Sequence, residues 1–562
     1  MKTILKNLAP LLLTLPATGT WPAEIWEQRA AGQRLPAPEY AQPAPAWPGH
    51  NEPQPAREAP LSTLERVVVE RFELTGNRAF SASELASVTA PYTHRAITAE
   101  ELQEVRRRLT LYYTERGYLN SGAVIPDQPV QEGVVRIRII EGRLARVEVT
   151  GNTHLRADYV QDRLRPAEDT PLNIQDLQDR LQRLQQNPLV EQLHATLAPG
   201  VEPGEGIMQL EVREARPYEV GLAVANNNPP SVGATRAHLY GFDRNLTGAG
   251  DTLALSYGHS LESTTDDWRV SYARPLSARD RTIQAWAEQN KTSVIENRFD
   301  RLDILSHLES YGVSLTEPVY QTLQQNLTLG ANLEWRHSKS TLLGYPFSFA
   351  PGEVNGEATV AVARFSQEWL DRRLDQVIAA RSTISAGLDA GNATIHSGGP
   401  DSRFWAWLGQ FQWAKRFGAR DYQVIFKANG QWASDSLLSM EKCALGGIDT
   451  VRGYPGNTLV RDQCFNTSLE FRVPVYELAL AGGRPNEGQV QLAAFADYGW
   501  AQNKGRFALD PEVLASVGIG ARWDPNAKIH AALYWGYPLR EVEKSDERSV
   551  GSRINFAVQV AY

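Results

Sequence analysis

The last three-fifths of the chain alternate apolar and polar side chains in short segments, which polar turns separate. This two-residue period runs through residues 218–562 and is typical of β-strands with one apolar face. Two architectures show it. One is a soluble sandwich or barrel with an apolar interior, and the other is an outer-membrane barrel with an apolar exterior and a polar lumen. The clearest segments are 405–414, 490–500 and 553–562.

Three features of this region favour the membrane barrel. The segments are close to the 9–11 residues that a tilted membrane strand needs. Aromatic residues recur near segment ends, as at a membrane interface. The final segment also ends on an aromatic residue, Tyr562, which suits closure of the last strand on the first, because an open edge is not tolerated in lipid. At roughly 21 residues per strand and loop, we predict an antiparallel barrel of about 16 strands.

Composition excludes several other classes of protein. No run of 18 apolar residues occurs, which excludes a helical membrane protein. The net charge of -8 and the pI of about 5.8 argue against a nucleic-acid binder. Two cysteines are too few for a disulfide scaffold or a Cys-rich metal protein. No HExxH, GxSxG, P-loop or CxxC pattern is present. We therefore expect no enzyme, no cofactor and no metal ion.

An internal repeat precedes the barrel region. Residues 72–77 (FELTGN) match 147–152 (VEVTGN), 75 positions later, and 134–141 match 207–214, 73 positions later. Matches in the same order predict two copies of one small domain, at 65–142 and 143–217.

Each copy is predicted to follow the order β-α-α-β-β. In the first copy the pairs Ser81/Glu84 and Thr98/Glu101 have the spacing of capping boxes and should begin its two helices. Apolar residues at helical spacing then give each second helix a buried face. These faces comprise Leu102, Val105, Leu109 and Tyr112 in the first copy, and Ile174, Leu177, Leu181 and Leu184 in the second. Neither copy carries a catalytic cluster.

The N-terminal region has the pattern of a signal peptide, a short helix and a linker. Lys2 and Lys6 precede a short apolar stretch and small residues, which predicts a signal peptide at 1–19; a short buried helix is the alternative. Residues 23–34 could form an amphipathic helix within the segment 20–34. The linker 35–64 follows, and its many prolines favour an extended, semi-rigid chain. A short helix on a long tether suggests an element that docks reversibly.

The most unusual segment is the glycine-rich loop 446–455, which carries Arg452. A buried guanidinium needs an acceptor, and the alternation places Asp497 on the lumen face of a later strand. We predict that the loop folds into the barrel and that Arg452 pairs with Asp497, a charge-assisted bond of about 1.5–3 kcal/mol. Spacing alone also allows a solvated surface loop in which the arginine has no partner.

The two cysteines, Cys443 and Cys464, bracket this loop. Export would place them in an oxidising compartment, where they are the one possible disulfide pair. Such a bridge would stabilise the fold by about 3 kcal/mol in the chain-entropy model. Two reduced thiols are the alternative.

Two motifs give the chain a family resemblance. The tetrad Val451, Arg452, Gly453 and Tyr454, together with Phe495, Asp497 and Gly499 in an FxDxG pattern, resembles the BamA-type superfamily of outer-membrane assembly and secretion factors. Two repeats, an N-terminal helix and a Pro-rich linker make the chain similar to its two-partner (type V) secretion branch, the TpsB transporters of the haemolysin secretion/activation type. The resemblance covers nearly the whole chain and implies a β-dominated fold: a 16-stranded transmembrane β-barrel (218–562) preceded by two α/β POTRA-like domains.

The resemblance also implies roles. The helix at 20–34 would plug a porin-like channel, and the linker would let it leave. The POTRA domains would bind an unfolded secreted partner in the periplasm by adding a strand. The Arg452 loop would hold a conformation needed for transport, and Phe556 and Tyr562 would belong to a signal read by the barrel-assembly machinery. The implied cargo is a large exoprotein: a haemolysin, an adhesin or a contact-dependent toxin. The alternatives are an insertase for other outer-membrane proteins and a passive porin. A porin would need neither soluble repeats nor a plug, so the two repeats argue against the porin.

Overall fold

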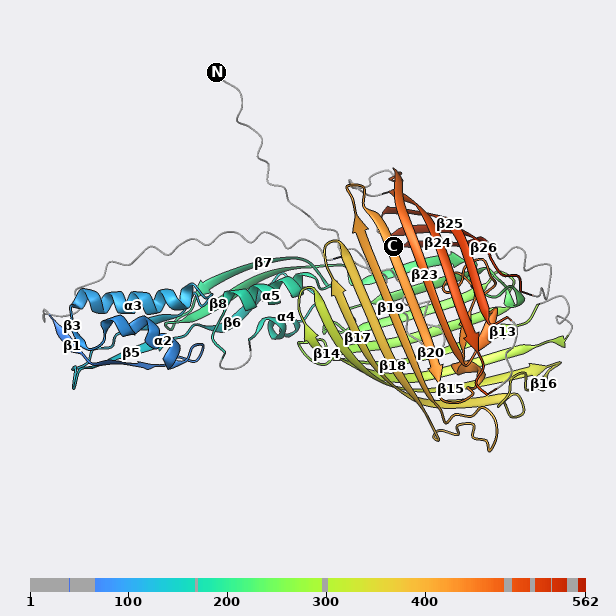
Figure 1. Cartoon of the computed structure of the whole chain (residues 1–562), viewed down its shortest axis with the longest axis horizontal. Coiled ribbons are helices and arrows are strands. Elements are labelled where there is room, and N and C mark those ends of the chain that lie inside the picture. The colour runs from blue at the N-terminus through green and yellow to red at the C-terminus, as the bar shows by residue number, and fades with distance from the viewer. Residues whose placement is uncertain are drawn as a thin grey trace, which may run out of the picture.

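The computed structural model describes residues 40, 66–166, 170–295, 302–479, 488–505, 511–526, 528–542 and 554–562. Two small α/β domains lie in a row beside a large closed barrel (Figure 1). The expected signal peptide 1–19, the helix 20–34 and the linker 35–64, apart from Tyr40, lie outside the described residues.

The first small domain has the predicted order of elements, with one addition. Both predicted capping boxes are present and begin helices α2 and α3. Its main sheet has the strand order β2-β5-β4, in which β2 is parallel to β5. A separate two-stranded sheet, β1-β3, was not predicted, because three-residue strands are too short to show a period. The elements are β1 Val67–Val69, β2 Arg71–Thr75, α2 Ala82–Thr89, η1 Ala90–Tyr92, β3 Arg95–Ile97, α3 Ala99–Thr114, β4 Gly122–Val124 and β5 Val134–Ile140.

The second small domain has the same topology without the extra sheet. Its strand order is β6-β8-β7, again with the opening strand parallel to the last one. The two copies of the sequence repeat therefore have the same sheet topology. The elements are β6 Arg143–Thr150, α4 Ala157–Leu164, α5 Ile174–Gln185, β7 Val190–Pro199 and β8 Glu205–Glu214.

Each small domain buries one face of its second helix against its sheet. In α5 the predicted residues Leu177, Leu181 and Leu184 are buried. In α3 the fully buried tyrosine is Tyr113 rather than Tyr112, because the inward stripe continues from Val105 and Leu109 in steps of four residues.

Backbone hydrogen bonds connect the two small domains directly. Leu172 donates its N–H to the carbonyl of Gly142 (2.6 Å), and Ile174 donates to Gly117 (2.9 Å). The second domain also meets the barrel, where the N–H of Arg156 donates to Gly248 (2.8 Å) in the turn after β10. The three units are therefore joined by hydrogen bonds as well as by the chain.

The barrel closes by pairing its last strand, β27, with its first, β9. Its 16 antiparallel strands confirm the predicted fold class, and β16 (Tyr345–Pro346) adds a two-residue hairpin to β15. The strands are β9 Tyr218–Ala225, β10 Arg236–Asp243, β11 Thr252–Ser260, β12 Thr265–Pro275, β13 Thr282–Ser293, β14 Leu305–Gln321, β15 Gln325–Leu342, β17 Glu357–Arg372, β18 Gln376–Leu388, β19 Trp405–Phe417, β20 Tyr422–Ala433, β23 Gln463–Glu477, β24 Gln489–Gln502, β25 Val513–Asn526, β26 Ile529–Pro538 and β27 Ile554–Ala561.

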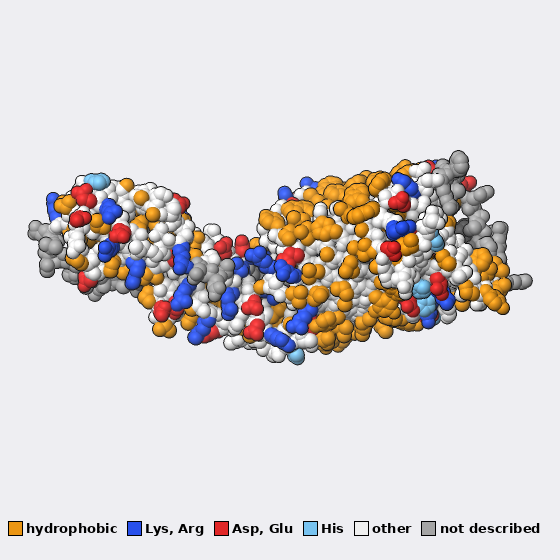
Figure 2. Space-filling model, turned by 90° about the horizontal axis from the view of Figure 1, so that it is seen from below, with side chains coloured by type: hydrophobic (Ala, Val, Ile, Leu, Met, Phe, Trp, Pro, Cys, Tyr) orange, Lys and Arg blue, Asp and Glu red, His pale blue; other side chains and the backbone are white. Residues whose placement is uncertain are grey.

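The barrel is apolar outside and polar inside. On β24, Leu492 is 51% exposed whereas its neighbour Gln491 is 6% exposed. Trp405 points outward in the same way, and Gln559 points inward. The outward side chains form a broad apolar band over the barrel, while charges gather toward its ends and on the small domains (Figure 2). This arrangement is that of a membrane barrel with a polar lumen.

Strand lengths depart from the prediction over most of the barrel. Ten of the sixteen strands have 12 or more residues, and β14 and β15 are the longest with 17 and 18, whereas 9–11 residues are enough to cross a membrane. The seam between β27 and β9 is short, with five residue pairs. No helix in the described part of the chain is long and apolar enough to span a membrane.

Candidate functional site in the barrel lumen

The glycine-rich loop connects β20 to β23 and folds into the barrel rather than into solvent. It contains a short hairpin, β21 (Cys443–Leu445) paired with β22 (Leu459–Arg461), whose tip carries the VRGY tetrad. Val451 and Tyr454 are 0% and 3% exposed, and Arg452 is 6% exposed. The alternative of a solvated surface loop is therefore wrong for the described structure.

Arg452 binds the carboxylate of Asp497 with two side-chain nitrogens. Its Nη2 donates to Oδ1 (2.7 Å) and its Nε to Oδ2 (2.8 Å). The backbone N–H of Arg452 also donates to Oδ2 (3.0 Å). A planar guanidinium matches a carboxylate in this two-pronged geometry, which lysine cannot reproduce. Three hydrogen bonds thus fix both the side chain and the backbone at this point of the loop.

Two further lumen residues that the sequence reasoning missed complete the polar contacts. Nη1 of Arg452 pairs with the carboxylate of Glu470, and Nη2 donates to the hydroxyl of Ser468 (2.9 Å). Both residues lie on β23, where Ser468 is directly opposite Asp497 in the register. Polar residues at every second position of β23 were the available signal, but only the strand register brings them to Arg452.

Aromatic rings enclose the guanidinium. Its central carbon lies 3.5 Å from the ring centre of Phe495 and 5.2 Å from that of Tyr534 on β26. These two rings meet edge to face, and the Tyr534 hydroxyl donates to Glu470 (3.0 Å). Stacking on aromatic faces adds to the attraction of a desolvated cation. Phe495 therefore contacts the same guanidinium as Asp497, which lies two residues away on the same face of β24.

The remaining motif residues shape the contact between the loop and the wall. Gly453 has a φ of +89°, and a Cβ there would lie 2.9 Å from the backbone of Gly536, so a side chain would not fit. A Cβ on Gly499 would lie 2.8 Å from Val451. The Tyr454 hydroxyl donates to the carbonyl of Arg540 (2.8 Å). Small residues thus allow the loop to lie directly on the strands.

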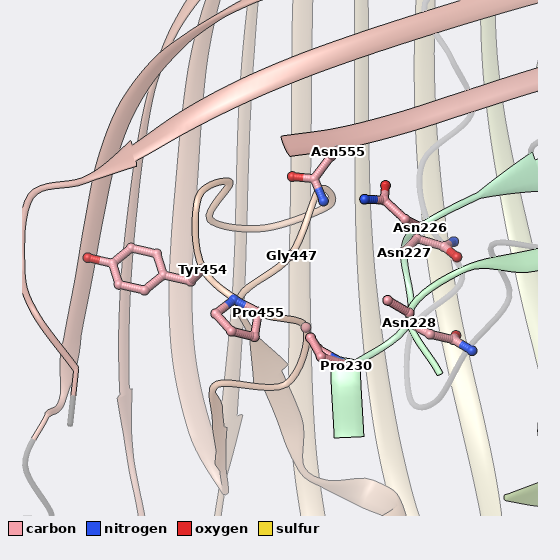
Figure 3. A pocket seen from close by; sticks show the side chains of 10 residues that line it. Asn226, Asn227, Asn228, Pro230, Gly447, Tyr454, Pro455 and Asn555 are labelled. Carbon is pink, nitrogen blue, oxygen red and sulfur yellow. The ribbon is translucent and has the colours of Figure 1, made fainter. Parts of the chain in front are cut away.

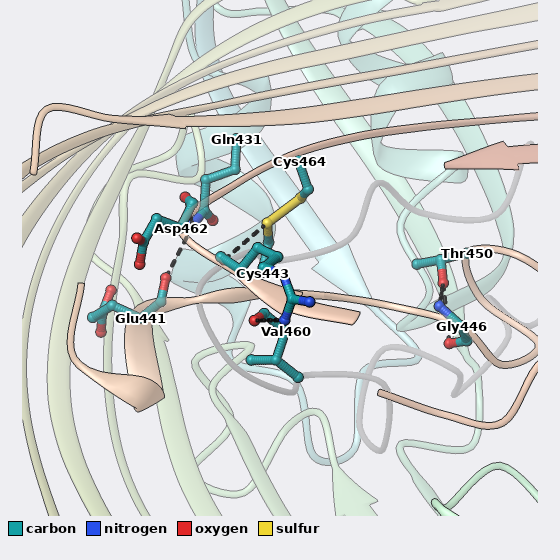
Figure 4. The surroundings of a disulfide bond; sticks show 9 residues. Gln431, Glu441, Cys443, Gly446, Thr450, Val460, Asp462 and Cys464 are labelled. Carbon is teal, nitrogen blue, oxygen red and sulfur yellow. Dashed lines mark hydrogen bonds between the residues drawn. A yellow bond between two sulfur atoms is a disulfide. The ribbon is translucent and has the colours of Figure 1, made fainter. Parts of the chain in front are cut away.

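A disulfide joins Cys443 on β21 to Cys464 on β23, with the two Cα atoms 6.3 Å apart (Figure 4). It therefore links the base of the lumen hairpin to the barrel wall. The pair was the only one that the sequence allowed.

The tip of the loop borders a pocket near the barrel seam (Figure 3). Tyr454 and Pro455 contribute from the loop, while Asn226 and Asn227 contribute from the segment after β9. The Asn226 side chain accepts the N–H of Phe556 (2.7 Å) and donates to the carbonyl of Ile554 (2.7 Å). It therefore continues the short β27–β9 pairing by one side chain.

The expected C-terminal signal residues lie on or beside this seam. Phe556 is part of β27. Tyr562 is 73% exposed, and its N–H donates to the carbonyl of Val220 (2.8 Å). The guanidinium of Arg216 stacks over its ring at 4.3 Å. The described residues contain no group of three His, Cys, Asp or Glu side chains placed to hold a metal ion.

Comparisons with known proteins agree with this architecture. A family model described as haemolysin secretion/activation protein ShlB/FhaC/HecB matches residues 204–523, more than half of the chain. A second, described as POTRA domain, ShlB-type, matches residues 67–142.

Similar proteins were found among both sequences and structures. The heme/hemopexin transporter protein HuxB of Haemophilus influenzae (strain 86-028NP) is 22% identical and covers 91% of this chain and 89% of its own. The outer membrane transporter CdiB of Escherichia coli is 22% identical, covering 85% and 78%. The structure of CdiB from Escherichia coli has a TM-score of 0.68 at 19% identity, covering 88% and 91%. That of BamA from Haemophilus ducreyi lacking POTRA domains 1–3 has a TM-score of 0.54 at 14% identity, covering 88% and 100%. At these identities the structural likeness concerns the fold.

Proposed function

We propose a function and a mechanism from one premise: this chain belongs to the haemolysin secretion/activation protein family ShlB/FhaC/HecB. The resemblance inferred from the sequence is therefore confirmed. The protein is an outer-membrane transporter of the two-partner secretion type, and it exports a secreted partner protein. Its barrel lies in the outer membrane and its POTRA domains in the periplasm. The family is a secretion family and not an enzyme family.

The observation that carries the mechanism is the attachment of the lumen loop by Arg452. One guanidinium joins the loop tip to β23 and β24 through Asp497 and Glu470. Charge-assisted hydrogen bonds are strong in a desolvated site but remain reversible. The VRGY tetrad and the FxDxG pattern thus act as two halves of one clasp, which holds the loop in the conformation needed for transport.

The two small domains, at 65–142 and 143–217, receive the partner protein. Their three-stranded sheets carry edge strands, and an edge strand can bind an extended chain by adding a strand. An unfolded partner suits this mode of binding, because its backbone N–H and C=O groups are free. The sequence has no P-loop, and on the family likeness alone we infer that folding of the partner outside the cell supplies the driving force.

The N-terminal segments complete the proposal. The signal peptide 1–19 directs export, the helix 20–34 plugs the resting lumen, and the linker 35–64 lets the helix leave. Tyr40 of the linker supports this placement, because the guanidinium of Arg416, near the periplasmic end of β19, lies 4.0 Å from its ring centre. Removing residues 20–34 should raise the ion conductance of the protein in planar bilayers.

The last strand and the outer surface of the barrel account for its assembly and for its contact with lipid. Phe556 and Tyr562 form the signal for the barrel-assembly machinery, and the outward apolar band contacts outer-membrane lipid. The cargo is a large exoprotein such as a haemolysin or an adhesin. The carboxyl-terminal strand, β27, is available for recognition before it pairs with β9.

Deletion of the protein followed by a survey of secreted and outer-membrane proteins tests the function. A transporter predicts the loss of one large exoprotein from the medium, with other barrel proteins unchanged. Loss of several barrel proteins from the membrane would instead indicate the insertase alternative, and an unchanged exoproteome would contradict export.

A further inference from the structure

The lumen loop has a second attachment to the wall, in a different part of the barrel from Arg452. The first arm of the loop, residues 434–442, contains the short η4 helix (Ser439–Glu441) and lies against β15 and β17. Glu441 at the end of η4 is 3% exposed. Its carboxylate accepts hydrogen bonds from Arg336 on β15 (3.0 Å) and from Arg364 on β17 (3.0 Å to each oxygen).

Glu441 balances the charge of this cluster. Arg336 and Arg364 also face the carboxylate of Glu334, at 3.8 Å and 3.4 Å. With Glu441 the group contains two cations and two anions; without it, one buried positive charge has no counterpart. A buried charge that loses its partner destabilises the structure strongly. The pairing of both arginines with Glu441 therefore stabilises the position of the loop arm on the barrel wall.

Apolar packing and the disulfide reinforce the same arm. Leu437 and Leu438 are buried in a cluster with Val360 and Val362, which β17 presents to the lumen instead of polar side chains. The N–H of Leu437 donates to Asp462 (3.0 Å). We call residues 434–445 and 459–464 the loop root; it includes both cysteines of the disulfide (Figure 4).

The loop tip, residues 446–458, is attached by other contacts. It begins with two glycines, Gly446 and Gly447, whose φ angles of +111° and +89° are accessible mainly to glycine. Beyond them, Arg452 binds β23 and β24, and Gly456 approaches the segment after β9. The η4 arm of the root therefore contacts a different part of the wall, β15 and β17, from the tip, whereas the β21–β22 hairpin lies against β23 and β24 beside the tip. The first arm of the root joins the tip at the glycine pair.

We propose that Glu441 is a positioning residue that anchors the loop root independently of Arg452, so that release of the Arg452 clasp moves the tip while the root stays on the wall. The link to transport rests on the proposed function, but the two-anchor arrangement does not. Gly446 and Gly447 are the hinge between a fixed root and a movable tip.

Spin labels in the purified full-length protein, reconstituted in lipid, test this arrangement. One label replaces Ser439 in the root, and a second, in a separate sample, replaces the exposed Asp449 in the tip. We expect Glu441→Gln to shift the Ser439 spectrum toward a mobile signal. Arg452→Ala should mobilise the Asp449 label and leave the Ser439 label as in the parent protein.

Glu368→Gln is the matched control, because Glu368 pairs with Arg381 (2.9 Å) within the barrel wall and not with the loop. It should change neither label. An immobile root label in Glu441→Gln would overturn the anchor, and mobilisation of the root by Arg452→Ala to the same extent would show that the loop moves as one body.

A folding defect is handled by a second variant. Glu441→Gln combined with Arg364→Gln restores charge balance, so it should fold even where the single variant does not. A mobile root in the double variant supports the anchor, whereas an immobile root would assign the attachment to apolar packing and overturn it. Failure of the parent protein to export its partner would refute the proposed function without changing these spectra.

Discussion

Replacing Arg452 by alanine should release the lumen loop and abolish or sharply reduce secretion. The guanidinium is 6% exposed, binds Asp497 and Glu470, and lies on the Phe495 ring. Its removal leaves two buried carboxylates, of which Glu470 keeps a hydrogen bond from Arg472 (2.6 Å) and Asp497 loses its side-chain partner.

The free-energy cost of Arg452→Ala follows from the loss of this buried ion pair. Breaking a buried ion pair by removing one partner costs about 3–5 kcal/mol. Because every 1.4 kcal/mol is a factor of ten in an equilibrium constant, the clasped loop should lose roughly two to three and a half orders of magnitude in population relative to the released loop. The released loop would then be the major state wherever the parent protein favours the clasped loop by less than this factor.

The assay compares export of the partner protein with folding of the barrel. Arg452→Ala should give a barrel that still shifts mobility on heating in a detergent gel, while the partner is missing from the medium. Arg381→Ala is the control, because it removes a barrel arginine that pairs with Glu368 on the neighbouring strand β17. Normal secretion by Arg452→Ala would refute the clasp, and equal loss in both variants would indicate a general defect of the barrel.

Three further predictions follow from single contacts. Gly499→Ala should reduce secretion, because a Cβ would lie 2.8 Å from Val451 and push the loop tip off β24; tip mobility by spin label checks this, and an unchanged signal would contradict it. Glu214→Gln should weaken the second POTRA domain at neutral pH: burial alone would raise the pKa of Glu214, but backbone N–H groups of the turn after β6 outweigh it and lower the pKa. The carboxylate therefore stabilises the fold above its unfolded pKa and loses that effect as the pH falls through the folded pKa, so amide exchange in this turn should differ between the two proteins at pH 7 and converge in acid; equal exchange at pH 7 would refute the role. Reduction of the Cys443–Cys464 bridge should change the mobility of the protein relative to the unreduced protein on a gel. Labelling of both thiols without reductant would contradict the bridge.

The sequence predicted the elements whose signal is local. The capping boxes at Ser81 and Thr98 begin helices as expected, because capping depends on residues three positions apart. The alternation around Asp497 gave its lumen orientation for the same reason. A period of two residues determines the face of a strand without knowledge of its neighbours.

The missed residues depend on the register between strands. Glu470 and Tyr534 lie on strands β23 and β26, so no spacing in the sequence relates them to Arg452. Glu441 was missed because its partners, on β15 and β17, precede it by 77 residues or more. Three-dimensional closure of the barrel creates these contacts, and a single sequence does not encode them in any visible pattern.

The bond between Cys443 and Cys464 closes residues 443–464 into a covalent ring, whose last two residues are the first two of β23. Its interior is already occupied, since Leu445, Val451 and Leu459 pack there against one another. However far the loop tip moves, the base of the hairpin therefore stays tied to β23 by this bond, with the two Cα atoms 6.3 Å apart. Separating the base from the barrel wall would require reduction of the disulfide.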